Sequence, residues 1–129
     1  MTDKAVNSKS VLEKLLKVMF KHQLQLKMYH FQTNGYGAHK ASDSYLEKFE
    51  SNLDKFMEVA QGIFGKLDTK SISLNFDTLT DETITGELDN FTNLLRQLDT
   101  YMAKNTELLN IRDEMIGDAQ QLKYLLTFK

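Results

Sequence analysis

The order of helical stretches and breaks along the chain constrains its fold more than any other feature. Apolar residues recur at three- and four-residue steps in four stretches, at about residues 10–33, 38–64, 82–104 and 106–127. This is the period of an amphipathic α-helix. No proline occurs in the 129 residues to interrupt a helix. The sequence therefore predicts an all-α fold built from four helices in a single domain, residues 1–129.

The first two stretches carry the signals of helix ends. Ser10 followed by Glu13 has the spacing of a capping box, which predicts the start of the first helix. Gly35 and Gly37 are expected to end that helix with left-handed backbone geometry, and Gly65 is expected to close the second helix. Because the break between these helices is so short, we expect them to lie side by side and antiparallel.

The middle break, residues 66–81, is much longer and has no helical period. Ile72, Leu74 and Phe76 alternate with polar residues, which is a strand-like pattern in a chain with no partner strand. We expect an extended crossover, whose ~15 residues at about 3.3 Å each can span the length of a helix. Two helical hairpins joined by one long crossover predict a ferritin-like four-helix bundle.

The bulk composition excludes several classes of protein. The chain has no cysteine, which excludes disulfides, cysteine-ligated zinc and thiol catalysis. It has no run of 18 apolar residues and no apolar leader segment, so we expect a cytoplasmic protein that does not enter a membrane. The net charge of -2 gives no general attraction to nucleic acid. Lys14, Lys17 and Lys21 form only a modest basic patch, and we expect DNA binding to be weak or absent.

The candidate metal ligands are two histidines and two carboxylates. His30 and His39 flank the turn between the first two helices, while Asp54 and Glu58 are four residues apart and share a helix face. Imidazoles and carboxylates together suit a transition metal such as iron or zinc. His39 and Asp54 lie 15 residues apart on one predicted helix, which is about 22 Å of rise. We therefore expect two chains to pair about a twofold axis, so that the histidines of one chain meet the carboxylates of the other.

A metal centre inside the bundle is the alternative. His22, Glu50 and Asp118 each lie near the middle of a predicted helix and would supply one imidazole and two carboxylates. The chain has no Glu-x-x-His step, which the di-iron centre of ferritin-like proteins takes from two of its helices. We therefore interpret His22 as a surface or boundary residue. No catalytic residue beyond the metal ligands and no site for an organic cofactor is predicted.

The His30-Phe31 step, His39, Asp54 and Glu58 together resemble the signature of the Dps-type mini-ferritins, over about residues 20–62. In that family a His-Trp step ends the first helix, a second histidine opens the next, and an Asp and a Glu follow at these separations. The resemblance implies ligands from two subunits, a homodimer within a twelve-membered shell, and a ferroxidase that oxidises and stores ferrous iron. Iron is then the expected metal, with zinc or another divalent metal as a substitute.

A second resemblance covers the end of the chain. Residues 110–115 (Asn-Ile-Arg-Asp-Glu-Met) and the Tyr124-Leu-Leu step are similar to short helical proteins of phage and large-virus genomes. This resemblance implies a viral protein in the host cytoplasm.

Two positions depart from the mini-ferritin pattern. Lys27 stands where the family usually has a ligand histidine, and a protonated lysine binds no metal. Phe31 replaces the tryptophan of the His-Trp step. The alternative function is therefore a non-catalytic helical assembly protein that keeps the fold without a working metal centre.

Overall fold

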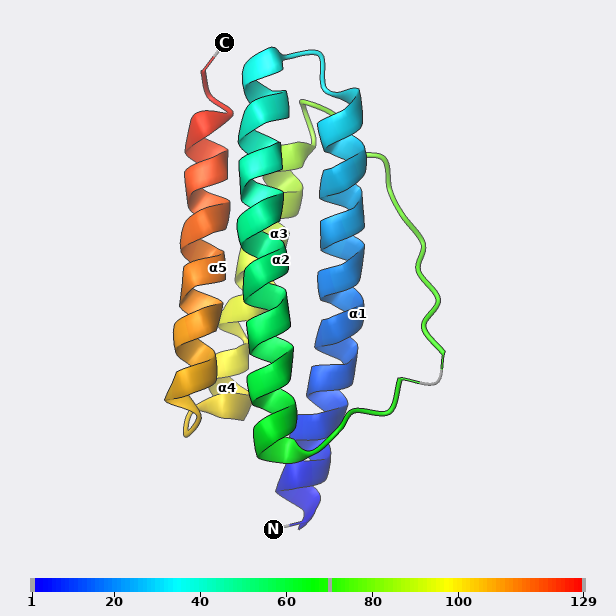
Figure 1. Cartoon of the computed structure of the whole chain (residues 1–129), viewed down its shortest axis with the longest axis vertical. Helices are drawn as coiled ribbons and strands as arrows, with labels where there is room; N and C mark the ends of the chain where they lie inside the picture. Colours follow the sequence, from blue (N-terminus) through cyan, green and yellow to red (C-terminus); the bar gives the residue numbers. More distant parts are fainter. Residues whose placement is uncertain (1, 70, 129) are drawn as a thin grey trace.

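The computed structural model describes residues 2–69 and 71–128, which form a helical bundle (Figure 1). Two long helices, α1 (Thr2–Gln32) and α2 (Tyr36–Phe64), make the first hairpin. Two shorter helices that follow each other, α3 (Ile84–Arg96) and α4 (Leu98–Met102), make the second hairpin with α5 (Thr106–Leu125). The predicted all-α class is confirmed, because the described residues contain no strand.

The helices form a bundle in which neighbours run in opposite directions (Figure 1). α1 packs against α2 and α3, and α5 packs against the same two helices. The crossover leaves the end of α2 and returns along α1 to the other end of the bundle, where α3 begins (Figure 1). This path explains why the middle connection has to be so much longer than the two hairpin turns.

The crossover, residues 65–83, is extended for most of its length and ends in a turn at residues 81–83 (Figure 1). Its described residues between 66 and 79 form no backbone–backbone hydrogen bonds. Its amides are held instead by side chains of the first hairpin: Leu67 N donates to Gln61 Oε1 (3.2 Å), Asp68 N to Glu13 Oε2 (2.8 Å) and Asp77 N to Gln25 Oε1 (3.0 Å). Leu79 is buried, whereas Ile72 and Phe76 are 38% and 49% exposed. The crossover is thus bound to the first hairpin by hydrogen bonds at separate positions, and the side chains of Ile72 and Phe76 between them remain partly exposed.

The core runs the length of the bundle and is contributed by every helix. Buried positions of α1 follow steps of three and four residues, as the helical period requires. The largest fully buried side chains include Phe49 and Phe56 of α2, Leu95 of α3 and Met115 of α5. Burying one such side chain stabilises the fold by about 1.5–3 kcal/mol, so packing between helices dominates the stability of the bundle.

Two predictions about the helices are wrong, one about where the first helix begins and one about the continuity of the third. α1 begins at Thr2 and not near residue 10, so Ser10 lies inside a helix and forms no capping box there. The first ten residues contain neither proline nor glycine, and nothing in them stops the helix. The predicted third helix is two helices, because Gln97 interrupts it. At this residue the hydrogen bonds tighten to three-residue steps, from Gln97 N to Leu94 O (3.1 Å) and from Thr100 N to Gln97 O (3.2 Å).

The prediction that Gly65 closes the second helix is confirmed, whereas the left-handed geometry predicted for Gly35 is wrong. Gly65 closes α2 with φ 91° and ψ 168°, a conformation that is essentially restricted to glycine. Gly35 was expected to be left-handed, but it has φ -100° and ψ 128°, which is extended backbone open to any residue. Gly37 lies inside α2. The α1–α2 turn therefore does not depend on left-handed geometry.

Candidate functional site

His30 and His39 face each other across the turn between α1 and α2. Their rings are stacked, with centroids 4.0 Å apart and planes inclined by 16°. His30 lies in the last turn of α1 and is buried. His39 lies in the first turn of α2 and is partly buried. The structure therefore brings these two predicted ligands together within one chain.

Each of the two imidazoles is fixed by a main-chain carbonyl of the opposite helix. His30 Nδ1 lies 2.8 Å from His39 O, and His39 Nδ1 lies 2.8 Å from His30 O. A carbonyl oxygen only accepts, so Nδ1 carries the hydrogen on both rings. Ser42 Oγ also lies 3.2 Å from His30 Nδ1 and donates to His39 O. In the neutral form the lone pair of each imidazole is consequently on Nε2.

The carboxylate of Asp43 lies beside His30 of this histidine pair. Its Oδ1 lies 3.9 Å from His30 Nε2, and its side chain is 52% exposed. Asp43 is not one of the ligands predicted from the sequence. The available signal was its spacing, because Asp43 follows His39 by four residues and shares a face of α2 with it.

Asp54 and Glu58 lie on the exposed side of α2, away from the histidine pair. α2 is continuous from Tyr36 to Phe64, so the separation of about 22 Å between His39 and Asp54 that helix rise implies applies in the structure as well. In the part of the chain that the structure describes, no group of three His, Asp or Glu side chains is placed to hold a metal ion. The four predicted ligands thus lie in two separate places, with His30 and His39 at the α1–α2 turn and the two carboxylates further along α2.

The outer side of α1 near the histidine pair is apolar. Leu24, Met28 and Phe31 follow the helical period and are 42%, 43% and 64% exposed. Lys27 Nζ lies 5.3 Å from the centre of the Phe31 ring, within the range of a cation–π contact. Both departures from the mini-ferritin pattern, Lys27 and Phe31, therefore belong to this one exposed surface.

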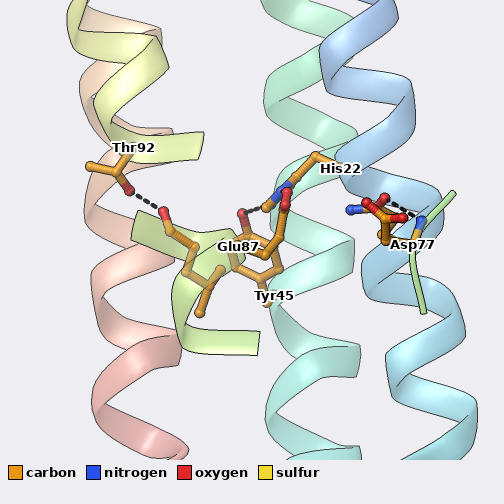
Figure 2. A network of polar contacts seen from close by, with 7 residues as sticks. His22, Tyr45, Asp77, Glu87 and Thr92 are labelled. Atoms are coloured by element: carbon orange, nitrogen blue, oxygen red, sulfur yellow. Dashed lines mark hydrogen bonds and ion pairs between the residues drawn. The ribbon is translucent and has the colours of Figure 1, made fainter. Parts of the chain in front are cut away.

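A second polar cluster lies inside the bundle, where His22 joins three helices (Figure 2). Its Nδ1 lies 2.6 Å from Glu87 Oε2 of α3, and its Nε2 lies 2.7 Å from the Tyr45 hydroxyl of α2. The ring of Phe91 stacks on the imidazole with centroids 3.8 Å apart and planes inclined by 8°. His22 is only 1% exposed, so the predicted surface or boundary position is wrong.

The partners of His22 differ from those proposed for a centre inside the bundle. Glu50 is exposed on α2, and Asp118 is partly buried and accepts a hydrogen bond from Asn52 Nδ2 (3.2 Å). The carboxylate beside His22 is instead that of Glu87, which is not one of the residues predicted from the sequence.

Burial shifts the titration of this inner cluster. Desolvation lowers the pKa of His22, although the hydrogen bond and the charge of Glu87 act in the opposite direction. Desolvation also raises the pKa of Tyr45, and the nearby carboxylates of Asp118 and Glu87 raise it further. The pKa of Asp118 is raised chiefly by burial, with the positive charge of Lys48 opposing that shift. At neutral pH the cluster therefore holds a neutral imidazole and a neutral phenol.

Comparisons with known proteins give one result. A model of the family described as "Family of unknown function (DUF5856)" matches residues 30–126, a span that contains all four predicted metal ligands. The comparisons with curated proteins and with solved structures gave no match. None of the helices within the described residues is long and apolar enough to cross a membrane.

Proposed function

The chain belongs to the DUF5856 family of unknown function, and we propose that it is an iron-binding oligomer that sequesters ferrous iron between paired chains. In this proposal His30 and His39 of one chain and Asp54 and Glu58 of its partner bind the same ion. The histidines of each chain and the carboxylates of its partner then form two equivalent inter-subunit sites related by a twofold axis. The bundle is, on this view, of the ferritin-like type.

The observation that carries the proposal is the way in which the two imidazoles are held. Metal-binding histidines commonly donate one ring N–H to a backbone carbonyl, which fixes the tautomer and directs the other nitrogen to the metal. His30 and His39 both show this arrangement, with Nδ1 on a carbonyl at 2.8 Å. The proximity of the Asp43 carboxylate to His30 Nε2 adds negative charge where a cation would bind.

The connectivity of the bundle and its exposed surface also support the proposal. Two antiparallel hairpins joined by a crossover that runs the length of the bundle is the connectivity of ferritin-like proteins (Figure 1). The apolar strip of Leu24, Met28 and Phe31 is suited to contact with another protein surface. A second copy of the chain covering this strip would approach the α1–α2 turn, where the histidines lie.

The chemistry expected of such a site is simple. Ferrous iron is the substrate, bound by neutral imidazoles and ionised carboxylates. Oxygen or peroxide then takes an electron from each ferrous ion, and the exposed acidic side of α2 collects the ferric product. Because protonated histidine binds no metal, we expect iron binding to weaken in acid.

Anaerobic titration with ferrous iron tests binding directly. We expect Glu58→Gln to lose most of the iron bound by the native chain, because one carboxylate ligand of each site is removed. Glu114→Gln is the matched control, since Glu114 is also an exposed glutamate inside a helix. No iron bound by the native chain, or equal losses in the two variants, would contradict the proposal.

A mixing experiment tests whether the sites lie between chains. His39→Gln dimers and Asp54→Asn dimers each lack every intact site. In a mixed dimer one site regains both residues, so random re-pairing restores about a quarter of the native sites. Restored binding after the two variants are unfolded and refolded together supports shared sites, whereas no restoration contradicts them.

A non-catalytic assembly protein is the second candidate, and Lys27 is the observation that favours it. Its ammonium group lies over Phe31 on the apolar strip, in the position where the mini-ferritin pattern has a ligand. Light scattering with the iron titration separates the two functions, because the second candidate self-associates without binding iron.

A further inference from the structure

Tyr45, His22 and Glu87 form a hydrogen-bonded chain across three helices in the interior of the bundle (Figure 2). The distances are 2.7 Å from Tyr45 Oη to His22 Nε2 and 2.6 Å from His22 Nδ1 to Glu87 Oε2. Tyr45 and His22 are 3% and 1% exposed. The proposed iron chemistry uses none of these three residues.

The positions of the hydrogens in this three-residue network follow from which atoms can only accept a hydrogen bond. The Glu87 carboxylate accepts, so His22 Nδ1 carries a hydrogen and the neutral ring has its lone pair on Nε2. The Tyr45 hydroxyl therefore donates to Nε2. The phenol proton of Tyr45 therefore points at the unprotonated Nε2 of His22. The other nitrogen of that imidazole donates to the Glu87 carboxylate.

We propose that Tyr45 is a redox-active tyrosine that passes its proton to His22 when it is oxidised. An external one-electron oxidant, such as an oxidised metal complex, takes one electron from the phenol, the Tyr45 O–H bond breaks, and the proton forms a new N–H bond at His22 Nε2. The products are a neutral tyrosyl radical, an imidazolium and the reduced oxidant. Reduction of the radical by one electron returns the proton to Tyr45.

The charges around the phenol favour this reaction. Before oxidation the hydrogen-bonded network of Tyr45, His22 and Glu87 carries one negative charge, that of Glu87. Afterwards the imidazolium and the carboxylate form a close pair with no net charge, which costs less in a low-dielectric interior than an isolated cation. Asp118 of α5 also acts on Tyr45 with its negative charge, and that charge likewise favours loss of an electron.

The surroundings of Tyr45 favour a radical that persists. Phe91 stacks on the His22 ring, and Phe49 lies against both Tyr45 and His22. Tyr45 itself is buried, so little water reaches the phenol. The chain has no tryptophan and no cysteine, so a tyrosine is the aromatic side chain from which an electron is most easily removed.

Tyr29 provides an internal comparison. It is 2% exposed and its hydroxyl donates to Asp81 Oδ1 (2.8 Å), which is a carboxylate and not an imidazole. Tyr36, Tyr101 and Tyr124 are 76%, 47% and 62% exposed. Only Tyr45, among the tyrosines of the described chain, combines deep burial with a hydrogen bond to histidine.

The inference does not depend on iron, so it is tested with metal-free protein. A ruthenium photosensitiser and an electron acceptor generate a one-electron oxidant in a flash, and electron paramagnetic resonance detects the radical. In the native chain we expect a tyrosyl signal that survives in the presence of a bulky, water-soluble reductant, which removes radicals on exposed tyrosines. The absence of a surviving signal overturns the proposal.

Substitutions then assign the signal. Tyr36→Phe, Tyr101→Phe and Tyr124→Phe together remove the exposed tyrosines and should leave the signal unchanged. Adding Tyr45→Phe to this background should abolish it, whereas adding Tyr29→Phe instead should not. The chain with Tyr45 as its single tyrosine decides the question even where Tyr45→Phe disturbs folding, and a signal that follows Tyr29 contradicts the assignment.

The role of His22 is tested by kinetics. His22→Gln keeps a polar side chain beside Tyr45 but cannot take up the proton. We expect oxidation of Tyr45 to slow at least tenfold and to lose the solvent deuterium isotope effect of the native chain. A purely structural role would leave the isotope effect intact, and an unchanged rate would overturn the proton transfer to His22.

Discussion

His22 is a buried base whose neutral form is favoured by the fold. Burial lowers its pKa below the ordinary value of 6.5, so the unfolded chain binds its proton more tightly than the folded chain. The stabilisation is therefore fully present above about pH 6.5 and is lost as the pH falls through 6.5 towards the folded-state pKa.

This shift predicts that acid destabilises the native chain partly through His22. Between pH 7 and pH 5, we expect the free energy of unfolding measured with urea to fall more in the native chain than in His22→Gln. His39→Gln is the control, because His39 is not deeply buried, and its loss should leave most of the pH dependence in place. Equal slopes for the native chain and His22→Gln would show that His22 does not carry the effect.

Gly65 is the residue at which backbone geometry matters most. Its φ of 91° and ψ of 168° are strained for any residue with a Cβ. A Cβ there would meet only Lys9 Nζ at 3.7 Å, an ordinary contact, so crowding adds nothing to the strain. We expect Gly65→Ala to lower the free energy of unfolding by about 1–3 kcal/mol.

Gly62 is the matched control in the same helix. It is an exposed residue inside α2, and an added Cβ would meet nothing within 4 Å. Gly62→Ala should raise the free energy of unfolding by about 0.5–1 kcal/mol. Chemical denaturation of both variants checks the pair, and effects of the same sign would contradict the geometry given for Gly65.

Among the elements, the junction between α3 and α4 depends on α5. Arg112 of α5 is buried and donates to Leu95 O (3.0 Å) just before the break, to Asp99 Oδ1 of α4 (2.8 Å) and to Asp113 Oδ1 (2.8 Å). The break at Gln97 disturbs the helical hydrogen bonds around it, and the guanidinium supplies a donor to the end of α3. One side chain thus connects three helices.

Arg112→Ala is therefore expected to destabilise the bundle by about 1–3 kcal/mol, because it removes the hydrogen bonds of a buried guanidinium to Leu95, Asp99 and Asp113. The control is Lys123→Ala, which removes a pair with Asp89 whose two side chains are 46% and 50% exposed. Such surface pairs contribute about 0–1 kcal/mol. Thermal unfolding followed by circular dichroism measures both, and a loss no larger in Arg112→Ala would refute the connecting role.

The helices themselves could be predicted from the sequence, since their apolar periods are long and no proline interrupts them. The position of His22 was missed because the chain lacks a Glu-x-x-His step, and His22 was therefore interpreted as a surface or boundary residue. The spacing Leu15, Met19, His22, Leu26 and Tyr29 follows steps of four and three and contains the missing signal. A polar residue in such a register is buried only when a partner on another helix satisfies it, and Glu87 lies 65 positions away in the sequence.

The candidate site was predictable only in part for a related reason. Helix spacing placed His30 beside His39 and separated both from Asp54, because these are local properties of two adjacent helices. It could not show that each imidazole donates to the opposite carbonyl, since that depends on how closely the helices approach. The break at Gln97 was likewise missed, because glutamine is a good helix former.

At the scale of the whole molecule, the apolar strip of Leu24, Met28 and Phe31 predicts self-association through α1. We expect Phe31→Ser to weaken the association of chains at least tenfold, equivalent to about 1.4 kcal/mol. Phe128→Ser is a matched control, since Phe128 is 63% exposed and Phe31 is 64% exposed, but Phe128 lies beyond α5. Sedimentation equilibrium measures both, and equal association in the two variants would place the contact elsewhere.

The crossover has a consequence for how the chain can be divided. It joins the two hairpins, yet its described residues between 66 and 79 are fastened mainly by the side chains of Gln61, Glu13 and Gln25, all from the first hairpin. A cut between residues 71 and 76 would break no backbone–backbone hydrogen bond among them. The protein is consequently a natural candidate for splitting into two co-expressed halves, which the interface of α1 and α2 with α3 and α5 would reassemble.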